Sequence, residues 1–145
     1  MRVGIGVVIA LIAFTLAGCA GTGSTAARNA ASSAGGGFIR LDERDNGHTV
    51  RVAKGYGVGV VLHSTYWTFA PLTGTDVLRP AGTPSTAALP PGNGCVPGGG
   101  CGTVTARFSA AGTGIVEVQA SRTTCGEAMG CVPDEASFAV TIEVG

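Results

Sequence analysis

The sequence has little charge, and neither sign predominates. It contains nine lysine and arginine residues against nine aspartate and glutamate residues, and Lys54 is its one lysine. No basic cluster interrupts this balance, although a basic face is the electrostatic signature of nucleic-acid-binding proteins. We therefore expect no nucleic-acid partner.

Motifs typical of catalysis are also missing. The two histidines, His48 and His63, fall in no metal-ligand spacing, and neither His-Glu-x-x-His nor Gly-x-Ser-x-Gly occurs. The glycine-rich run 98–102 lacks the lysine of a phosphate-binding loop. We interpret the acidic pair Asp134 and Glu135 as a solvated turn. The sequence thus predicts a protein that is not an enzyme and that needs no cofactor or metal.

The N-terminus, in contrast, carries a targeting signal. Met1 and Arg2 give a positive start, residues 3–16 are apolar, and Leu16-Ala17-Gly18-Cys19 follows. This pattern predicts a secretory signal over residues 1–18. The alternatives are a signal cleaved to release a soluble protein and a transmembrane helix, but the apolar run is shorter than the ~20 residues that such a helix needs.

The four residues that end the signal resemble the lipobox of bacterial lipoproteins. The resemblance implies that the thiol of Cys19 receives a diacylglycerol and that Cys19 begins the mature chain. The protein would then sit on the extracytoplasmic face of a bacterial membrane, with the lipid bilayer as a partner. After Cys19, residues 20–37 contain no large apolar side chain, so we expect 19–37 to be a flexible tether. The remaining residues, 38–145, are enough for one domain.

The pattern in this domain is that of strands. Apolar and polar residues alternate with period two over several short segments, and no segment has a helical period. The predicted strands are 49–53, 56–62, 65–69, 76–78, 103–108, 116–121 and 138–144. The Pro- and Gly-rich segment 81–100 is predicted to be a long loop. About seven short strands predict an all-β, immunoglobulin-like antiparallel sandwich.

Trp67 is the natural centre of that sandwich's core. The alternative is an exposed anchor for a partner, because large aromatic side chains serve both uses.

Four further cysteines follow a repeated spacing. Cys95 and Cys101 form one Cys-x5-Cys pair, and Cys125 and Cys131 form another. An even number in an exported domain predicts two disulfides. Local pairing is preferred, although all three connectivities stay open. Zinc binding is the other alternative, but zinc sites usually have closer cysteine pairs.

The order of segments resembles a known family. A glycine-rich loop precedes a strand ending at Phe108; the turn 110–113, a strand to Arg122 and a closing strand 138–144 follow. This order resembles chagasin-type inhibitors of papain-like cysteine peptidases. The resemblance implies an immunoglobulin-like sandwich over the whole domain and a cysteine peptidase as a partner.

Those inhibitors carry Asn-Pro-Thr-Thr-Gly, Gly-x-Gly-Gly and Arg-Pro-aromatic in three loops at one end of the sandwich. Here the first loop is shortened, the second survives as Gly99-Gly100-Cys101-Gly102, and Arg122 is followed by Thr123-Thr124-Cys125. The partner-contacting residues implied by the resemblance are Tyr66, Trp67, Gly99, Gly102 and Arg122.

Two functions remain in view. One is a lipid-anchored, non-enzymatic protein-binding module, with peptidase inhibition as its specific form. The other is a structural envelope lipoprotein without a discrete binding site. Gly-Cys-Val-Pro occurs at 94–97 and again at 130–133. The repeat is explained either by chance in a chain rich in Gly, Pro and Val or by two similar turns that form one rigid platform.

Overall fold

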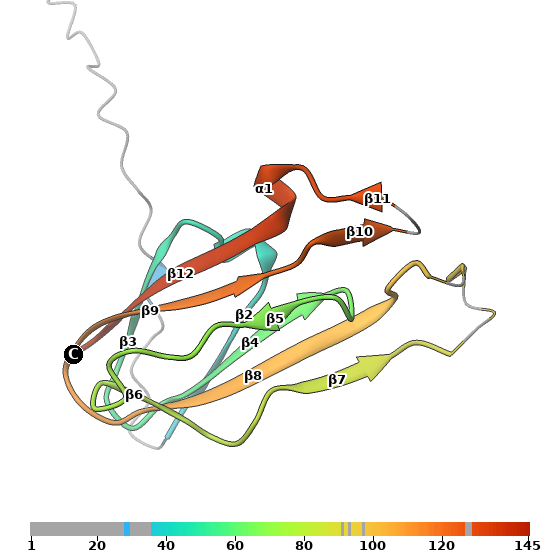
Figure 1. Ribbon diagram of the computed structural model, residues 1–145. Helices are drawn as coiled ribbons and strands as arrows, with labels where there is room; N and C mark the ends of the chain where they lie inside the picture. Colours follow the sequence, from blue (N-terminus) through green and yellow to red (C-terminus); the bar gives the residue numbers. More distant parts are fainter. Residues whose placement is uncertain (1–27, 30–35, 91, 93, 97, 127–128) are drawn as a thin grey trace, which may run out of the picture.

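The computed structural model describes residues 28–29, 36–90, 92, 94–96, 98–126 and 129–145 (Figure 1). The predicted signal segment 1–18 and Cys19 lie outside the described residues, as does most of the predicted tether. Among the residues that are described, no helix is long and apolar enough to cross a membrane.

Two sheets pack face to face in the domain. One sheet has the order β1-β3-β12-β9-β5, and the other has the order β2-β4-β8-β6, with β7 also pairing with β8. The first sheet consists of β1 (Arg28–Asn29), β3 (Thr49–Val52), β12 (Ser137–Val144), β9 (Gly114–Ser121) and β5 (Thr68–Phe69). The second consists of β2 (Phe38–Leu41), β4 (Gly57–His63), β8 (Gly102–Ala110), β6 (Leu78–Pro80) and β7 (Ser85–Ala88).

Smaller elements lie outside the two sheets. They are the 3-10 helix η1 (Glu43–Asp45), the hairpin strands β10 (Thr124–Gly126) and β11 (Met129–Gly130), and the one-turn helix α1 (Pro133–Ala136). Asp42 caps η1, because its carboxylate accepts a hydrogen bond from the backbone N–H of Arg44 at 2.9 Å. That bond lowers the pKa of the Asp42 carboxyl below its ordinary value.

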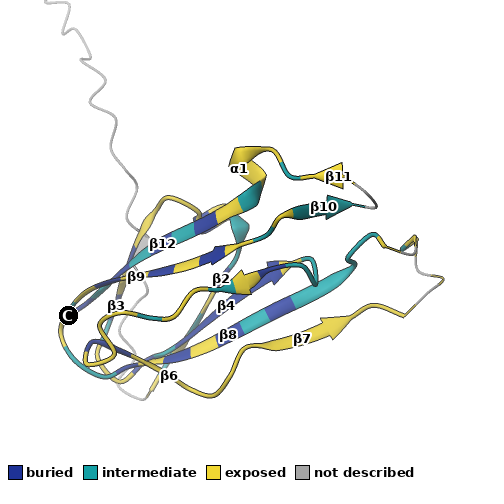
Figure 2. Ribbon diagram, viewed as in Figure 1, coloured by how far each residue is buried: buried dark blue, intermediate teal, exposed yellow. Residues whose placement is uncertain are grey.

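The core forms where the period-two pattern predicts it. In β12, Phe138, Val140, Ile142 and Val144 are all buried, while the residues between them are not. Figure 2 shows the same alternation along β9 and β8. One apolar face of each sheet therefore meets the other, which confirms the predicted all-β sandwich.

Several sequence predictions about individual segments were wrong. The predicted loop 81–100 contains the strand β7, whose four exposed residues pair with β8. These residues are small and do not alternate between apolar and polar, so they carry no period-two signal. The predicted strand 65–69 is shortened to β5, because 64–66 form a turn in which Ser64 has a φ of 132°.

Other differences are smaller. The strand predicted at 76–78 begins only at Leu78 and includes Pro80, which an edge strand tolerates. The helix α1 has a single turn, too short to produce a helical period. Within the predicted tether, Arg28 and Asn29 pair in parallel with β3.

Candidate functional site

Three connecting segments meet at one end of the sandwich, which we call the loop end. They are the turn 64–67 after β4, the loop 89–101 before β8, and the segment 122–132 after β9 (Figure 1). Strand pairing places them there, since the end of β4 lies beside the start of β8 and the end of β9 beside the start of β12. The chain crosses from one sheet to the other at this end, since the turn 64–67 leads from β4 to β5, whose Thr68 pairs with Ser121 in β9.

Two disulfides close two of these segments. Cys95 is bonded to Cys101, and Cys125 to Cys131, so the preferred local pairing is the one found. With all four sulfurs in disulfides, these cysteines cannot form the alternative zinc site; moreover, no cluster of metal-binding side chains occurs among the described residues. Two disulfides indicate an oxidising, extracytoplasmic compartment.

Tyr66 holds the loop 89–101. Its hydroxyl donates a hydrogen bond to the carbonyl of Gly98 at 2.7 Å, and the N–H of the preceding Thr65 donates to the carbonyl of Gly100 at 2.7 Å. A Cβ atom at Gly100 would lie 2.4 Å from the tyrosine ring, at a φ of +63°. The tyrosine therefore lies close against this glycine, and no larger residue fits there without displacing it.

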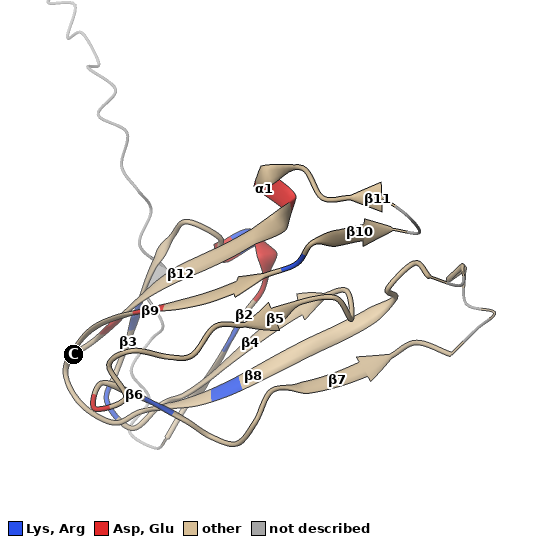
Figure 3. Cartoon of the chain, in the orientation of Figure 1, with Lys and Arg blue, Asp and Glu red and all other residues tan. Residues whose placement is uncertain are grey.

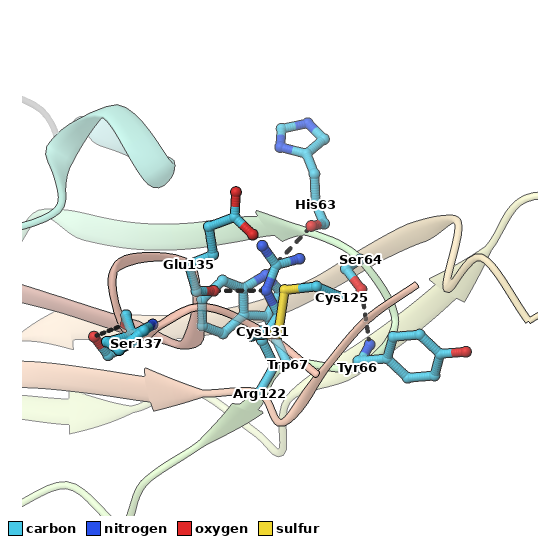
Figure 4. Close-up of a disulfide and its surroundings, with 10 residues drawn as sticks. His63, Ser64, Tyr66, Trp67, Arg122, Cys125, Cys131, Glu135 and Ser137 are labelled. Atoms are coloured by element: carbon cyan, nitrogen blue, oxygen red, sulfur yellow. Dashed lines mark hydrogen bonds between the residues drawn. A yellow bond between two sulfur atoms is a disulfide. The ribbon is translucent and has the colours of Figure 1, made fainter. Parts of the chain in front are cut away.

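Trp67 faces the other way, into the core, and is 5% exposed. Its indole N–H donates to the carbonyl of His63 at 3.3 Å, and the guanidinium carbon of Arg122 lies 4.6 Å from the ring centre (Figure 4). Arg122 also donates through Nε to the carbonyl of Glu135 at 2.8 Å. A cation above a tryptophan ring is an attractive arrangement. The Trp67–Arg122 contact thus supports the base of segment 122–132 from within.

The two candidate glycines have structural roles in the loop 89–101 and at its junction with β8. Gly99 lies inside the ring closed by Cys95 and Cys101, where a Cβ would be 3.0 Å from the carbonyl oxygen of Val96. Gly102 has a φ of +137°, and a Cβ there would lie 2.2 Å from the carbonyl oxygen of Ala87. Both positions therefore allow close backbone packing that a side chain would prevent.

Large apolar side chains are exposed at the loop end. They are Leu89, Val96, Met129 and Val132. Together with Tyr66 and the Cys95–Cys101 disulfide, Leu89 and Val96 line a hollow of about 310 Å³. Figure 3 shows that the drawn part of the loop 89–101 carries no charged residue. Sequence reasoning missed these four residues because nothing in a loop sequence tells which apolar side chains stay exposed.

The histidine nearest the loop end is engaged in a surface contact. His63 Nδ1 lies 2.9 Å from a carboxylate oxygen of Glu43, and its backbone N–H donates to the other oxygen. The His63 side chain is largely exposed and that of Glu43 is partly buried. The pair links η1 to the end of β4. That the protein is not an enzyme stays a prediction.

Comparison with known proteins bears on the fold. No protein-family model matches the chain, and no curated protein matches its sequence. A cysteine protease inhibitor from Entamoeba histolytica, EhICP2, superposes with a TM-score of 0.52 at 10% identity, over 75% of this chain and 96% of the inhibitor. The fold is chagasin-like. Amebosin superposes with a TM-score of 0.51 at 19% identity, over 77% of this chain and all of amebosin.

In the chagasin-like fold of this chain, the loop end contains the three segments that the family resemblance marks as partner-contacting. The structure brings Tyr66, Trp67, Gly99, Gly102 and Arg122 together at that end. At these identities, the likeness concerns the fold alone.

Proposed function

We propose that this chain is an exported, non-enzymatic protein-binding module whose loop end receives a protein partner. The observation that carries the proposal is the gathering of two disulfide-closed segments and exposed apolar side chains at one end of a rigid sandwich. Loops fixed in advance lose little entropy on binding, and exported sandwiches commonly place function on such loops.

Cysteine peptidase inhibition is the specific form of this proposal. It is supported by the fold shared with EhICP2, which is a cysteine protease inhibitor. The turn 64–67 offers one half-exposed aromatic side chain, Tyr66, whereas Trp67 is buried. Because this turn is shorter than the family's first loop, we expect weak inhibition. Titration of papain with the purified protein tests this form, and sub-micromolar inhibition would show that the short turn suffices.

We further propose that Cys19 is acylated and anchors the protein to a membrane. The strand β2 begins at Phe38, which pairs with Gly57 at the start of β4, whereas the loop end lies beyond His63 at the other end of β4. Because Arg28 pairs with Val50 in β3, residues 20–27 connect Cys19 to the fold, and they reach at most about 30 Å when fully extended. The tether therefore joins the sandwich at the end opposite the loop end. Attachment there supports a loop end that is directed away from the bilayer. Intact-mass measurement tests the anchor, and retention of residues 1–18 would refute it.

A capture experiment tests the binding surface. Purified protein with both disulfides intact is mixed with bacterial envelope extract, beside a variant with Val96→Ser and Met129→Ser. The matched control is Ile115→Ser, because Ile115 is 71% exposed but lies at the other end of the sandwich, opposite Glu143.

We expect a partner that the native protein and the Ile115 variant retain and the double variant loses. Equal retention by all three would remove the loop end as the binding surface. No captured protein at all would favour a structural envelope lipoprotein.

A further inference from the structure

The strand β7 forms part of an edge of its sheet. The N–H of Leu89, the next residue, donates to the carbonyl of Cys101 at 3.1 Å, and β7 is antiparallel to β8. Residues alternate in such a ladder, so Ser85 and Ala87 bond to β8 while Thr86 and Ala88 direct their backbone N–H and C=O away from it.

A bond on the other side of β8 supports this assignment. The carbonyl of Gly102, the residue opposite Ala88, accepts from Ser64 on the β4 side at 2.9 Å. Within the described part of the chain, β7 pairs with β8 alone, and all four of its residues are exposed. The edge thus presents unpaired backbone groups to an incoming strand.

A hollow lies at each end of this edge. Beyond Leu89 is the hollow of about 310 Å³ that Tyr66 and Val96 also line. Before Ser85 is a second hollow of about 260 Å³, whose apolar lining includes Phe69, Leu72, Pro84 and Phe108. In strand addition, main-chain bonds supply affinity and pockets for side chains supply specificity. The edge and its two hollows offer both.

The charge pattern narrows the kind of strand that fits. No residue from Pro80 to Ala106 is charged, and Figure 3 shows the ribbon of β7 without a charged residue. Among the described residues, Arg107 is the one charged residue that lines the second hollow. A charged segment would find almost no opposite charge here. Pro84 and Pro90 flank β7 and have no N–H, so they limit the number of main-chain bonds that an added strand forms.

We propose that the edge of β7 is a strand-addition site for an extended, uncharged segment of a protein partner, with a large apolar side chain entering the hollow at each end. The segment needs about six residues to span the edge, because a strand rises about 3.3 Å per residue. The inference rests on the proposed function, since it names the kind of partner segment that the module binds.

Selection from a displayed library of random ten-residue peptides tests this site, with the purified exported protein as the target. Thr86→Pro removes an outward N–H without breaking a bond to β8, as edge strands permit. Ile115→Ser is the matched control, because Ile115 is 71% exposed, lines neither hollow and lies at the other end of the sandwich. A second arm N-methylates alternate amides of each selected peptide, which leaves the protein unchanged.

We expect uncharged peptides whose Kd rises at least tenfold with Thr86→Pro and with N-methylation, and changes less than twofold with Ile115→Ser. Should the proline variant not fold, N-methylation alone decides. The inference is overturned if no peptide is selected, or if binding survives both changes.

Two further outcomes separate this inference from the proposed function. Loss of peptide binding with Met129→Ser, but not with Thr86→Pro, would reject strand addition and retain loop-end binding. Sedimentation at rising protein concentration reports self-association, and a dimer abolished by Thr86→Pro would assign the edge to a second copy instead. Capture from envelope extract with Met129→Ser alone, which changes neither hollow, tests the proposed function separately.

Discussion

The two disulfide-closed segments have the same spacing and share Gly-Cys-Val-Pro, yet they fold differently. The cysteines of each pair are six positions apart. In the segment 122–132, Thr124 pairs with Gly130 and Gly126 with Met129, so this disulfide braces a small hairpin followed by α1. The described residues of 95–101 form no strand, and their path follows turns at Gly98 and Gly100, whose φ values are 77° and 63°.

The difference shows that a disulfide fixes only the ends of a short segment. The backbone path of the segment depends on the conformations that the residues between the cysteines can adopt and on the side chains that pack beside them. Tyr66 holds the first segment by its hydroxyl, while Trp67, the next residue, supports the second through Arg122. The turn 64–67 therefore serves both segments with two adjacent aromatic side chains.

Removing each disulfide is the strongest way to break this comparison. The double variants are Cys95→Ser with Cys101→Ser, and Cys125→Ser with Cys131→Ser. For closed loops of this length we expect each to lower the free energy of unfolding by about 2–3 kcal/mol. Because the loop lengths are equal, chain entropy predicts equal losses in urea denaturation. A difference above about 1 kcal/mol would show that packing against Tyr66 or Trp67 contributes in addition to chain entropy.

Matched glycine substitutions test how closely the backbone is packed beside each disulfide-closed segment. Gly102→Ala places a Cβ 2.2 Å from a backbone oxygen at a φ of +137°, whereas Gly126→Ala in the hairpin meets nothing within 4 Å. We expect Gly102→Ala to cost about 1–3 kcal/mol, and Gly126→Ala to stay within about 0.5 kcal/mol of the native protein. Thermal unfolding of the two variants measures the difference. Equal stabilities would mean that the backbone of β7 moves away from the added Cβ at little cost in free energy.

The sequence predicted the parts of the fold where residue pattern and burial agree. In β12 and β9, alternate apolar residues face the core, and both strands were correctly predicted. The strand β7 was missed because its small residues are all exposed, and pairing with β8 alone makes them a strand. An edge strand of this kind leaves no period-two signal.

The candidate site was predictable in position but not in detail. Cysteine spacing indicated the two disulfides, and the family resemblance marked the three segments of the loop end. The opposite directions of Tyr66 and Trp67 depend on the turn at Ser64, with its φ of 132°, which no local pattern specifies. The exposure of Leu89, Val96, Met129 and Val132 likewise depends on the tertiary fold.

Two single substitutions remove the contacts of Tyr66 and Trp67 one at a time, and we expect them to have the smallest effects on stability. Tyr66→Phe deletes the hydroxyl that donates to Gly98, and Arg122→Gln deletes the cation 4.6 Å from the centre of the Trp67 ring. Each should cost about 0.5–1.5 kcal/mol. Their local effects should differ, since each support contacts one segment. Tyr66→Phe should raise the rate of amide hydrogen exchange in 94–100. Arg122→Gln should raise that rate in 122–131. If either variant loosened both segments equally, the turn 64–67 would couple the two loops into one platform instead of holding each separately.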